Sequence, residues 1–124
     1  MVLVDTSIWV AHFRKSDPLL IKLLLAEQVL GHPFVIGELT LGNFANRAEV
    51  FGLMQSLPAS PLAEPAEVLA FIDNRRLAEK GIGYVDACLL SSAALHGNAQ
   101  LWTRDQHLLA AAQSIKLAFF AAPV

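Results

Sequence analysis

The sequence predicts an α/β fold: one domain over residues 1–124, with a central, mostly parallel sheet of four to five strands flanked by helices. Three observations predict this class. Short apolar segments of strand length alternate with longer segments of helical pattern, turn or capping residues separate them, and 124 residues suit one hydrophobic core. Because right-handed helical crossovers join parallel strands, the carboxyl ends of these strands should meet at one edge of the sheet.

The first elements of the chain are a strand and two helices. The apolar run 2–4 predicts the strand, and the segment 6–14 predicts the first helix. A second helix is expected over 18–30, because Asp17 can cap it, a proline can begin it and Gly31 can end it.

The middle of the chain continues this alternation. The apolar segment 33–36 predicts a short strand, and helical patterns follow at 37–44 and 46–57. Another short strand is expected at 60–63, before a helix over 65–80 that begins at a proline.

The last third of the chain repeats the pattern twice. Two glycines precede a helix expected over 85–96, which Gly97 closes. A strand at 100–103, a helix at 105–113 and a last strand at 115–120 complete the expected order.

Composition excludes several classes of protein. The chain is 55% hydrophobic, above the average of roughly 45–50%, yet no apolar run reaches the ~18–20 residues that a membrane-spanning helix needs. No basic segment precedes a long apolar stretch at the N-terminus, so we expect no signal peptide and a cytoplasmic protein. The single cysteine, Cys88, excludes an intrachain disulfide and a metal site of several thiolates.

Four acidic residues occupy positions that this fold would bring together. Asp5 ends the first strand, Glu38 comes two residues after the expected strand 33–36, and Asp105 comes two residues after the strand that Thr103 ends. Asp86 opens the helix that precedes that strand. Crowded carboxylates repel one another, and raised pKa values or a bound cation must relieve the repulsion. Ligation by oxygen alone suits Mg²⁺ or Mn²⁺.

Each acid also has a simpler interpretation. Asp5, Asp86 and Asp105 all stand where a helix begins, and a carboxylate there caps exposed amide groups. Glu38 could equally be an acid in the first turn of a helix. The four histidines are scattered along the sequence and are expected at the surface or in loops, so no zinc site is predicted.

Neighbouring polar residues could support such a site. Thr6, Ser7 and Thr103 provide hydroxyls that could orient a carboxylate, a water molecule or a phosphate oxygen. Arg104 lies between Thr103 and Asp105 and could bind a phosphate. The net charge of −2 does not by itself indicate a nucleic-acid binder. Without the four acids, however, the nine lysines and arginines outnumber the remaining acids.

Four segments in this order resemble a known family. VDTS at the N-terminus, the GE step at residue 38, VDACLLSSAALHG and LWTRDQHL are similar to segments of the PIN-domain ribonucleases, in particular of VapC-type toxins of toxin–antitoxin modules. The resemblance implies a PIN-like three-layer sandwich and a Mg²⁺- or Mn²⁺-dependent endoribonuclease. By motif position it assigns metal binding and catalysis to Asp5, Glu38, Asp86 and Asp105.

The resemblance carries further expectations. It implies an RNA substrate and a cognate VapB-like antitoxin that inhibits the toxin. Some members of the family have another acid two residues beyond the fourth, where this chain has His107. The number of metal ions held during catalysis is therefore left open.

Two other functional classes are weighed from the residues. A phospho-accepting receiver domain has a similar length and an acidic pocket, but it requires an Asp after the third strand and a Lys near the last, and neither is present at those positions. A metal-free binding or dimerisation module would use all four acids as helix caps.

The expected helix 18–30 indicates a partner surface. Its polar residues point in different directions, which leaves no continuous polar face. One apolar face can pack on the sheet, and the other is expected to form a homodimer or an antitoxin groove.

Overall fold

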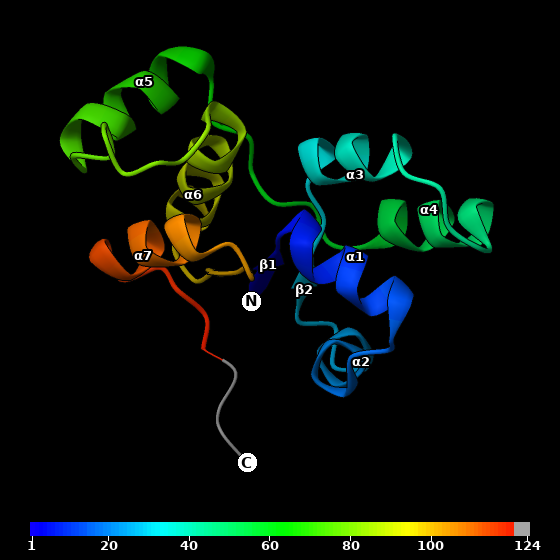
Figure 1. Ribbon diagram of the computed structural model, residues 1–124. Helices are drawn as coiled ribbons and strands as arrows, with labels where there is room; N and C mark the ends of the chain where they lie inside the picture. Colours follow the sequence, from blue (N-terminus) through cyan, green and yellow to red (C-terminus); the bar gives the residue numbers. More distant parts are fainter. Residues whose placement is uncertain (121–124) are drawn as a thin grey trace.

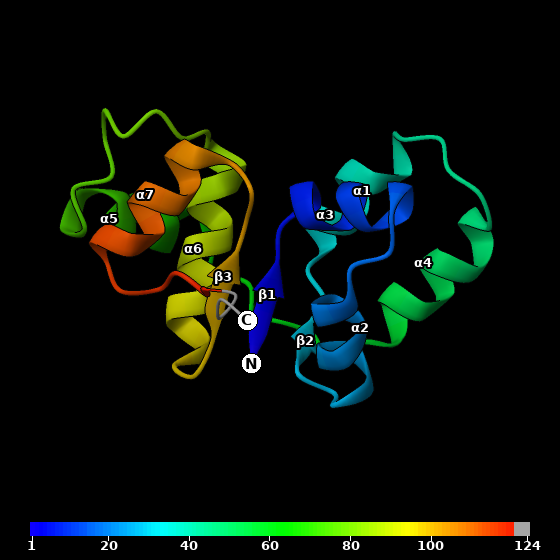
Figure 2. The same ribbon diagram turned by 60° about the horizontal axis from the view of Figure 1, so that its bottom comes forward.

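The computed structural model describes residues 1–120, and its centre is a parallel sheet of three strands (Figures 1 and 2). The strands are β1 (Val2–Val4), β2 (Val29–Leu30) and β3 (Gln100–Trp102), in the order β2–β1–β3, and both pairings are parallel. Single parallel bridges extend the sheet at each edge, from Gly31 to Ala59 and from Leu101 to Ala118. The mostly parallel sheet is confirmed, with three strands rather than four to five.

Seven helices in the described part of the chain cover this sheet. Their bounds are α1 (Thr6–Arg14), α2 (Pro18–Leu25), α3 (Pro33–Thr40), α4 (Arg47–Ser56), α5 (Pro65–Asn74), α6 (Tyr84–His96) and α7 (Gln106–Ser114). Helices α1–α4 lie on one side of the strands and α5–α7 on the other (Figure 2). The expected arrangement, a sheet between helices, is confirmed.

The expected helix 18–30 is too long. It ends at Leu25, and the chain then turns into β2. The cause is Glu27, which takes a left-handed conformation with φ of 56°. The Gln28 amide donates to the Leu23 carbonyl and the Glu27 amide to the Leu24 carbonyl, as in a Schellman motif.

The expected strand 33–36 is wrong, because these residues form the first turn of α3. A proline at the first helical position has its φ fixed for the helix and lacks an amide hydrogen that would go unpaired there. His32 supplies the cap: its Nδ1 accepts a hydrogen bond from the Phe34 amide at 3.1 Å. Glu38 therefore comes from the second turn of a helix and not from the end of a strand.

Two further strands are reduced to single bridges. The expected strand 60–63 is wrong: the chain makes a single bridge there, at Ala59, one residue before it. The segment 115–120 pairs only at Ala118. Helix α5 ends at Asn74 and not at residue 80, because Arg76 takes a left-handed φ of 54° and the Leu77 amide bonds back to the Ile72 carbonyl.

The core lies where the sheet meets helix α6. Leu3 and Val4 of β1, Leu89 and Leu90 of α6 and Leu101 of β3 are completely buried. No helix among residues 1–120 is long and apolar enough to cross a membrane.

Candidate active site

Asp5 lies at the carboxyl end of the central strand and is 7% exposed. Its backbone amide donates to the Trp102 carbonyl at 2.9 Å, so the pairing of β1 with β3 continues to the site. The Oδ2 atom of Asp5 accepts hydrogen bonds from Thr103 Oγ1 at 2.7 Å and from Ser7 Oγ at 2.8 Å. These bonds fix the carboxylate and leave Oδ1 for another partner.

The same hydroxyls join the ends of β1 and β3. The Arg104 amide donates to Ser7 Oγ at 3.0 Å, and the Asp105 amide donates to Thr103 Oγ1 at 3.0 Å. A chain of hydrogen bonds thus runs from the backbone after β3, through two hydroxyls, to Asp5. Ser7 and Thr103 position the carboxylate in this structure, and the side chain of Arg104 is exposed to solvent.

Asp86 and Asp105 lie at the N-termini of two helices. Asp105 caps α7, and its Oδ1 accepts from the Leu108 amide at 2.9 Å. Asp86 is in the first turn of α6, where its Oδ2 accepts from the Gly83 amide at 3.1 Å. Both residues therefore accept the backbone hydrogen bonds at helix N-termini that the simpler interpretation predicts. Each carboxylate keeps a second oxygen that this bond does not use.

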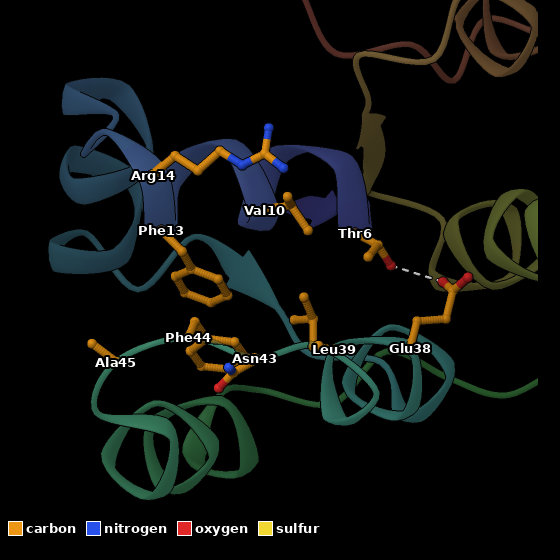
Figure 3. Close-up of a pocket in the computed structure, with 10 residues that line it drawn as sticks. Thr6, Val10, Phe13, Arg14, Glu38, Leu39, Asn43, Phe44 and Ala45 are labelled. Atoms are coloured by element: carbon orange, nitrogen blue, oxygen red, sulfur yellow. Dashed lines mark hydrogen bonds between the residues drawn. The ribbon is translucent and has the colours of Figure 1, made fainter.

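Glu38 reaches the site from α3. Its Oε1 accepts a hydrogen bond from Thr6 Oγ1 at 2.7 Å, which connects α3 to the first turn of α1. Figure 3 shows this bond closing one end of the space between the two helices. Thr6 thus orients Glu38 as Ser7 and Thr103 orient Asp5.

The electrostatics of Asp86 indicate that the acids lie near one another. Burial raises the pKa of Asp86; the hydrogen bond from the Gly83 amide opposes this, and the negative charges of Asp5, Asp105 and Glu38 raise the pKa further. Within residues 1–120, however, no three Asp, Glu, His or Cys side chains are gathered closely enough to hold a metal ion. Asp86 and Asp105 each accept a hydrogen bond from a backbone amide three residues away, whereas Glu38 and Asp5 accept from the hydroxyls of Thr6 and of Ser7 and Thr103.

The imidazole of His32 is buried, although the sequence predicted a surface or loop position. The residue is only 2% exposed. Its Nδ1 accepts from the Phe34 amide, so the ring proton is on Nε2, which lies 3.0 Å from Ser92 Oγ. This bond connects the start of α3, which carries Glu38, to α6, which carries Asp86. Histidine is an uncommon cap, so the sequence offers little signal for it.

A groove beside the acids was also not foreseen. It has a volume of about 400 Å³ and runs between α1 and the segment from α3 to residue 45 (Figure 3). Its lining includes Thr6 and Glu38 at one end and the aromatic side chains of Phe13 and Phe44 at the other. Aromatic residues far apart in sequence gave no indication that they would meet.

Known proteins resemble this chain in sequence and in fold. A family model described as PIN domain matches residues 2–113. Ribonuclease VapC32 from Mycobacterium tuberculosis, in strain CDC 1551 / Oshkosh and in strain ATCC 25618 / H37Rv, is 47% identical over 111 residues, which cover 90% of each chain. The crystal structure of PAE2754 from Pyrobaculum aerophilum aligns with a TM-score of 0.56 and 20% identity, over 94% of this chain and 88% of that one. This last likeness concerns the fold alone.

Proposed function

Because this chain belongs to the PIN domain family, we propose that it is an endoribonuclease that hydrolyses RNA phosphodiester bonds where Asp5, Glu38, Asp86 and Asp105 meet. The observation that carries the proposal is that Asp5 follows β1 directly and that its charge, with those of Asp105 and Glu38, acts on Asp86. The high identity to a protein named as a ribonuclease supports it. We further propose that residues 1–124 form one domain.

The donor set fits a hard divalent cation, Mg²⁺ or Mn²⁺. All four acids offer carboxylate oxygens, and three of them make a single side-chain hydrogen bond each in this structure. Their mutual repulsion, which acts on the pKa of Asp86, would be relieved by a positive ion. A bound ion supplies neutralisation of phosphate charge and activation of water for in-line attack.

The protein's own groups hold the acids and the substrate. Ser7 and Thr103 keep Asp5 in one orientation, so its unused Oδ1 atom is available as a ligand. Thr6 performs the same task for Glu38. The exposed guanidinium of Arg104 would contact a phosphate of the RNA next to the scissile bond. One carboxylate accepts the proton of the attacking water.

A role as the toxin of a toxin–antitoxin module extends this proposal. The likeness to Ribonuclease VapC32 supports it, and it implies a VapB-like antitoxin as partner and action in the cytoplasm. Helix α2 gives the partner a surface: Leu20 is fully buried, but Ile21 is 41% and Leu25 82% exposed. We propose that this apolar face forms a homodimer or receives the antitoxin.

Mapping of cleaved ends in cellular RNA tests the function directly. Brief expression of the wild type should create new RNA ends bearing 5′-phosphates, whereas the Asp5→Asn variant, expressed to the same level, should create none. The matched control is Asp73→Asn, which removes an exposed carboxylate at the end of α5. If Asp5→Asn cleaves as well as this control, the acidic site is not the nuclease site.

A further inference from the structure

The groove beside the acids combines apolar walls with polar groups. Val10 of α1 and Leu39 of α3 face it from opposite sides, between the bond of Thr6 to Glu38 and the aromatic end (Figure 3). Its volume of about 400 Å³ falls within the ~300–1,000 Å³ of ligand pockets.

The aromatic end is a preformed stack. The rings of Phe13 and Phe44 lie 4.5 Å apart between centroids with an angle of 15°, and Phe51 meets Phe44 edge-on at 5.6 Å. Asn43, which lines the groove next to Phe44, has an amide that can both donate and accept hydrogen bonds. Phe13 covers one face of the Phe44 ring, and the pair offers its remaining surface to the groove. Aromatic side chains and amides are groups that contact unstacked bases of single-stranded RNA.

Arg14 adds a positive charge to the lining of the groove. Figure 3 shows its side chain extending along α1 towards Val10. Thr6 and Arg14 are eight residues apart, which corresponds to about 12 Å along a helix. A short stretch of single-stranded RNA could therefore place one phosphate at the acids and a neighbouring phosphate near Arg14.

The position of the groove favours RNA over a protein as its occupant. Glu38 belongs both to the groove and to the proposed catalytic set, so whatever lies in the groove lies next to the reacting phosphodiester. A cation and an amide line it, in contrast to α2, where Ile21 and Leu25 expose apolar side chains that suit a protein partner.

We propose that this groove is a subsite that takes one unpaired nucleobase of the RNA strand, with the Phe13–Phe44 pair as its aromatic contact, Asn43 for the base edge and Arg14 for the adjoining phosphate. The subsite would select cleavage positions by the base that it holds. This inference rests on the proposed ribonuclease function and deepens it.

Binding of short single-stranded RNA tests the subsite. The probes are labelled homopolymers of each of the four bases and an abasic oligomer with the same ribose–phosphate backbone. The full chain carrying Asp5→Asn, in Ca²⁺, keeps the probes intact. At least one base should bind roughly tenfold more tightly than the abasic oligomer. Asn43→Ala and Phe44→Leu should each reduce that ratio by roughly threefold or more.

Arg14→Gln should act differently from the two other substitutions. It should weaken every probe, the abasic oligomer included, by a similar factor and should reduce the salt dependence of binding by about one phosphate contact. Asn43 and Arg14 are exposed, so these two variants test the subsite even if Phe44→Leu disturbs folding. Asn74→Ala and Arg75→Gln, at the end of α5, are the matched controls and should change neither quantity.

Two results would overturn the subsite. One is that Asn43→Ala and Phe44→Leu leave the ratio of base-bearing to abasic affinity unchanged from that of the Asp5→Asn protein. The other is a loss confined to binding of the cognate antitoxin, which would make the groove a protein-docking site. Cleavage of RNA by the wild type in Mg²⁺ is measured in parallel. If the wild type cleaves RNA, either of these two results contradicts the subsite but not the ribonuclease function. If the wild type does not cleave RNA, the proposed function fails as well.

Discussion

At the scale of single residues, Asp86 is an acid whose surroundings disfavour its charge. Its folded-state pKa lies above the ordinary value, chiefly because of burial. Such a group contributes to the free energy of unfolding when it is protonated. The contribution is complete at a pH below its unfolded pKa and is lost as the pH rises through its folded pKa. At neutral pH the charged form is therefore a cost to the metal-free protein.

Replacing Asp86 should accordingly separate stability from activity. Asp86→Asn should raise the unfolding midpoint of the metal-free protein near pH 7, and the gain should shrink in acid. It should lower RNA cleavage by roughly a hundredfold or more, since even residues around metal ligands cost 10–100-fold. Thermal unfolding and cleavage rates measure both effects. A variant that is unstable but fully active would indicate that Asp86 serves only as a first-turn acid of α6.

Thr103 provides a second test at this scale, because its hydroxyl connects two of the acids. It donates to Asp5 and accepts from the Asp105 amide, and the residue is 6% exposed. Thr103→Val keeps the shape but leaves the Asp105 amide without its acceptor and Asp5 with only the hydrogen bond from Ser7. It should cost about 1–3 kcal/mol of unfolding free energy and roughly 10–100-fold of activity.

The matched control is Thr40→Val on α3. Thr40 is exposed, and its hydroxyl donates only to the Gly37 carbonyl within its own helix. This substitution should change stability by no more than about 0.5 kcal/mol. Equal effects of the two substitutions in chemical denaturation and in cleavage assays would contradict the positioning role of Thr103.

At the scale of elements, His32 joins α3 to α6 by a buried hydrogen bond. Burial lowers its pKa to about 4. Its contribution to stability is complete above the unfolded pKa of 6.5 and is lost as the pH falls from there towards the folded value. A shift of this size corresponds to about 3 kcal/mol.

His32→Asn tests this link, since asparagine can still cap α3 but does not titrate in this range. The loss of unfolding free energy between pH 6.5 and pH 4 should be about 3 kcal/mol smaller in the variant than in the wild type. Denaturant titrations at several pH values measure it. His107→Asn, at an exposed position of α7, is measured alongside as the matched substitution. Identical slopes for wild type and His32→Asn would mean that His32 is not the group that titrates.

Helix α2 is the second feature at this scale, because it exposes apolar side chains. Leu25→Glu should leave the unfolding free energy within about 0.5 kcal/mol of the wild type, since Leu25 is 82% exposed. It should reduce self-association, or binding of the antitoxin, as measured by light scattering coupled to size-exclusion chromatography. Leu62→Glu, at another exposed leucine, is the control. A wild type that stays monomeric at high concentration and a complex insensitive to Leu25→Glu would rule this surface out.

At the scale of the whole molecule, the sequence predicted the fold class and most of the order of elements. Strand β1, helix α1 and strand β3 lie close to their expected bounds, since apolar runs and a cap residue mark them clearly. The ends of α2 and α5 were expected too far along the chain, because neither helix ends at a glycine. Glu27, Arg76 and Lys116 take left-handed conformations and reverse the chain after α2, α5 and α7, and non-glycine residues give no such signal in sequence.

The positions of the site residues could be predicted from sequence for some of the acids and not for others. Asp5 and Asp105 could be placed because they follow strands that pair in parallel. Glu38 was given the wrong element, because the apolar residues 34–36 fit a strand as well as a helix and only the cap by His32 decides. The hydroxyl partners of the acids depend on tertiary packing, so sequence could name Ser7 and Thr103 but not their bonds.

The central claim, a cation-dependent ribonuclease site, is tested most directly by RNA cleavage under controlled metal conditions. The purified wild type should cleave RNA in Mg²⁺ or Mn²⁺, lose this activity in EDTA and regain it when either ion is restored. Ca²⁺ should not restore it, since its looser coordination activates water poorly. Undiminished cleavage in EDTA, or equal cleavage by Asp5→Asn, would contradict the account.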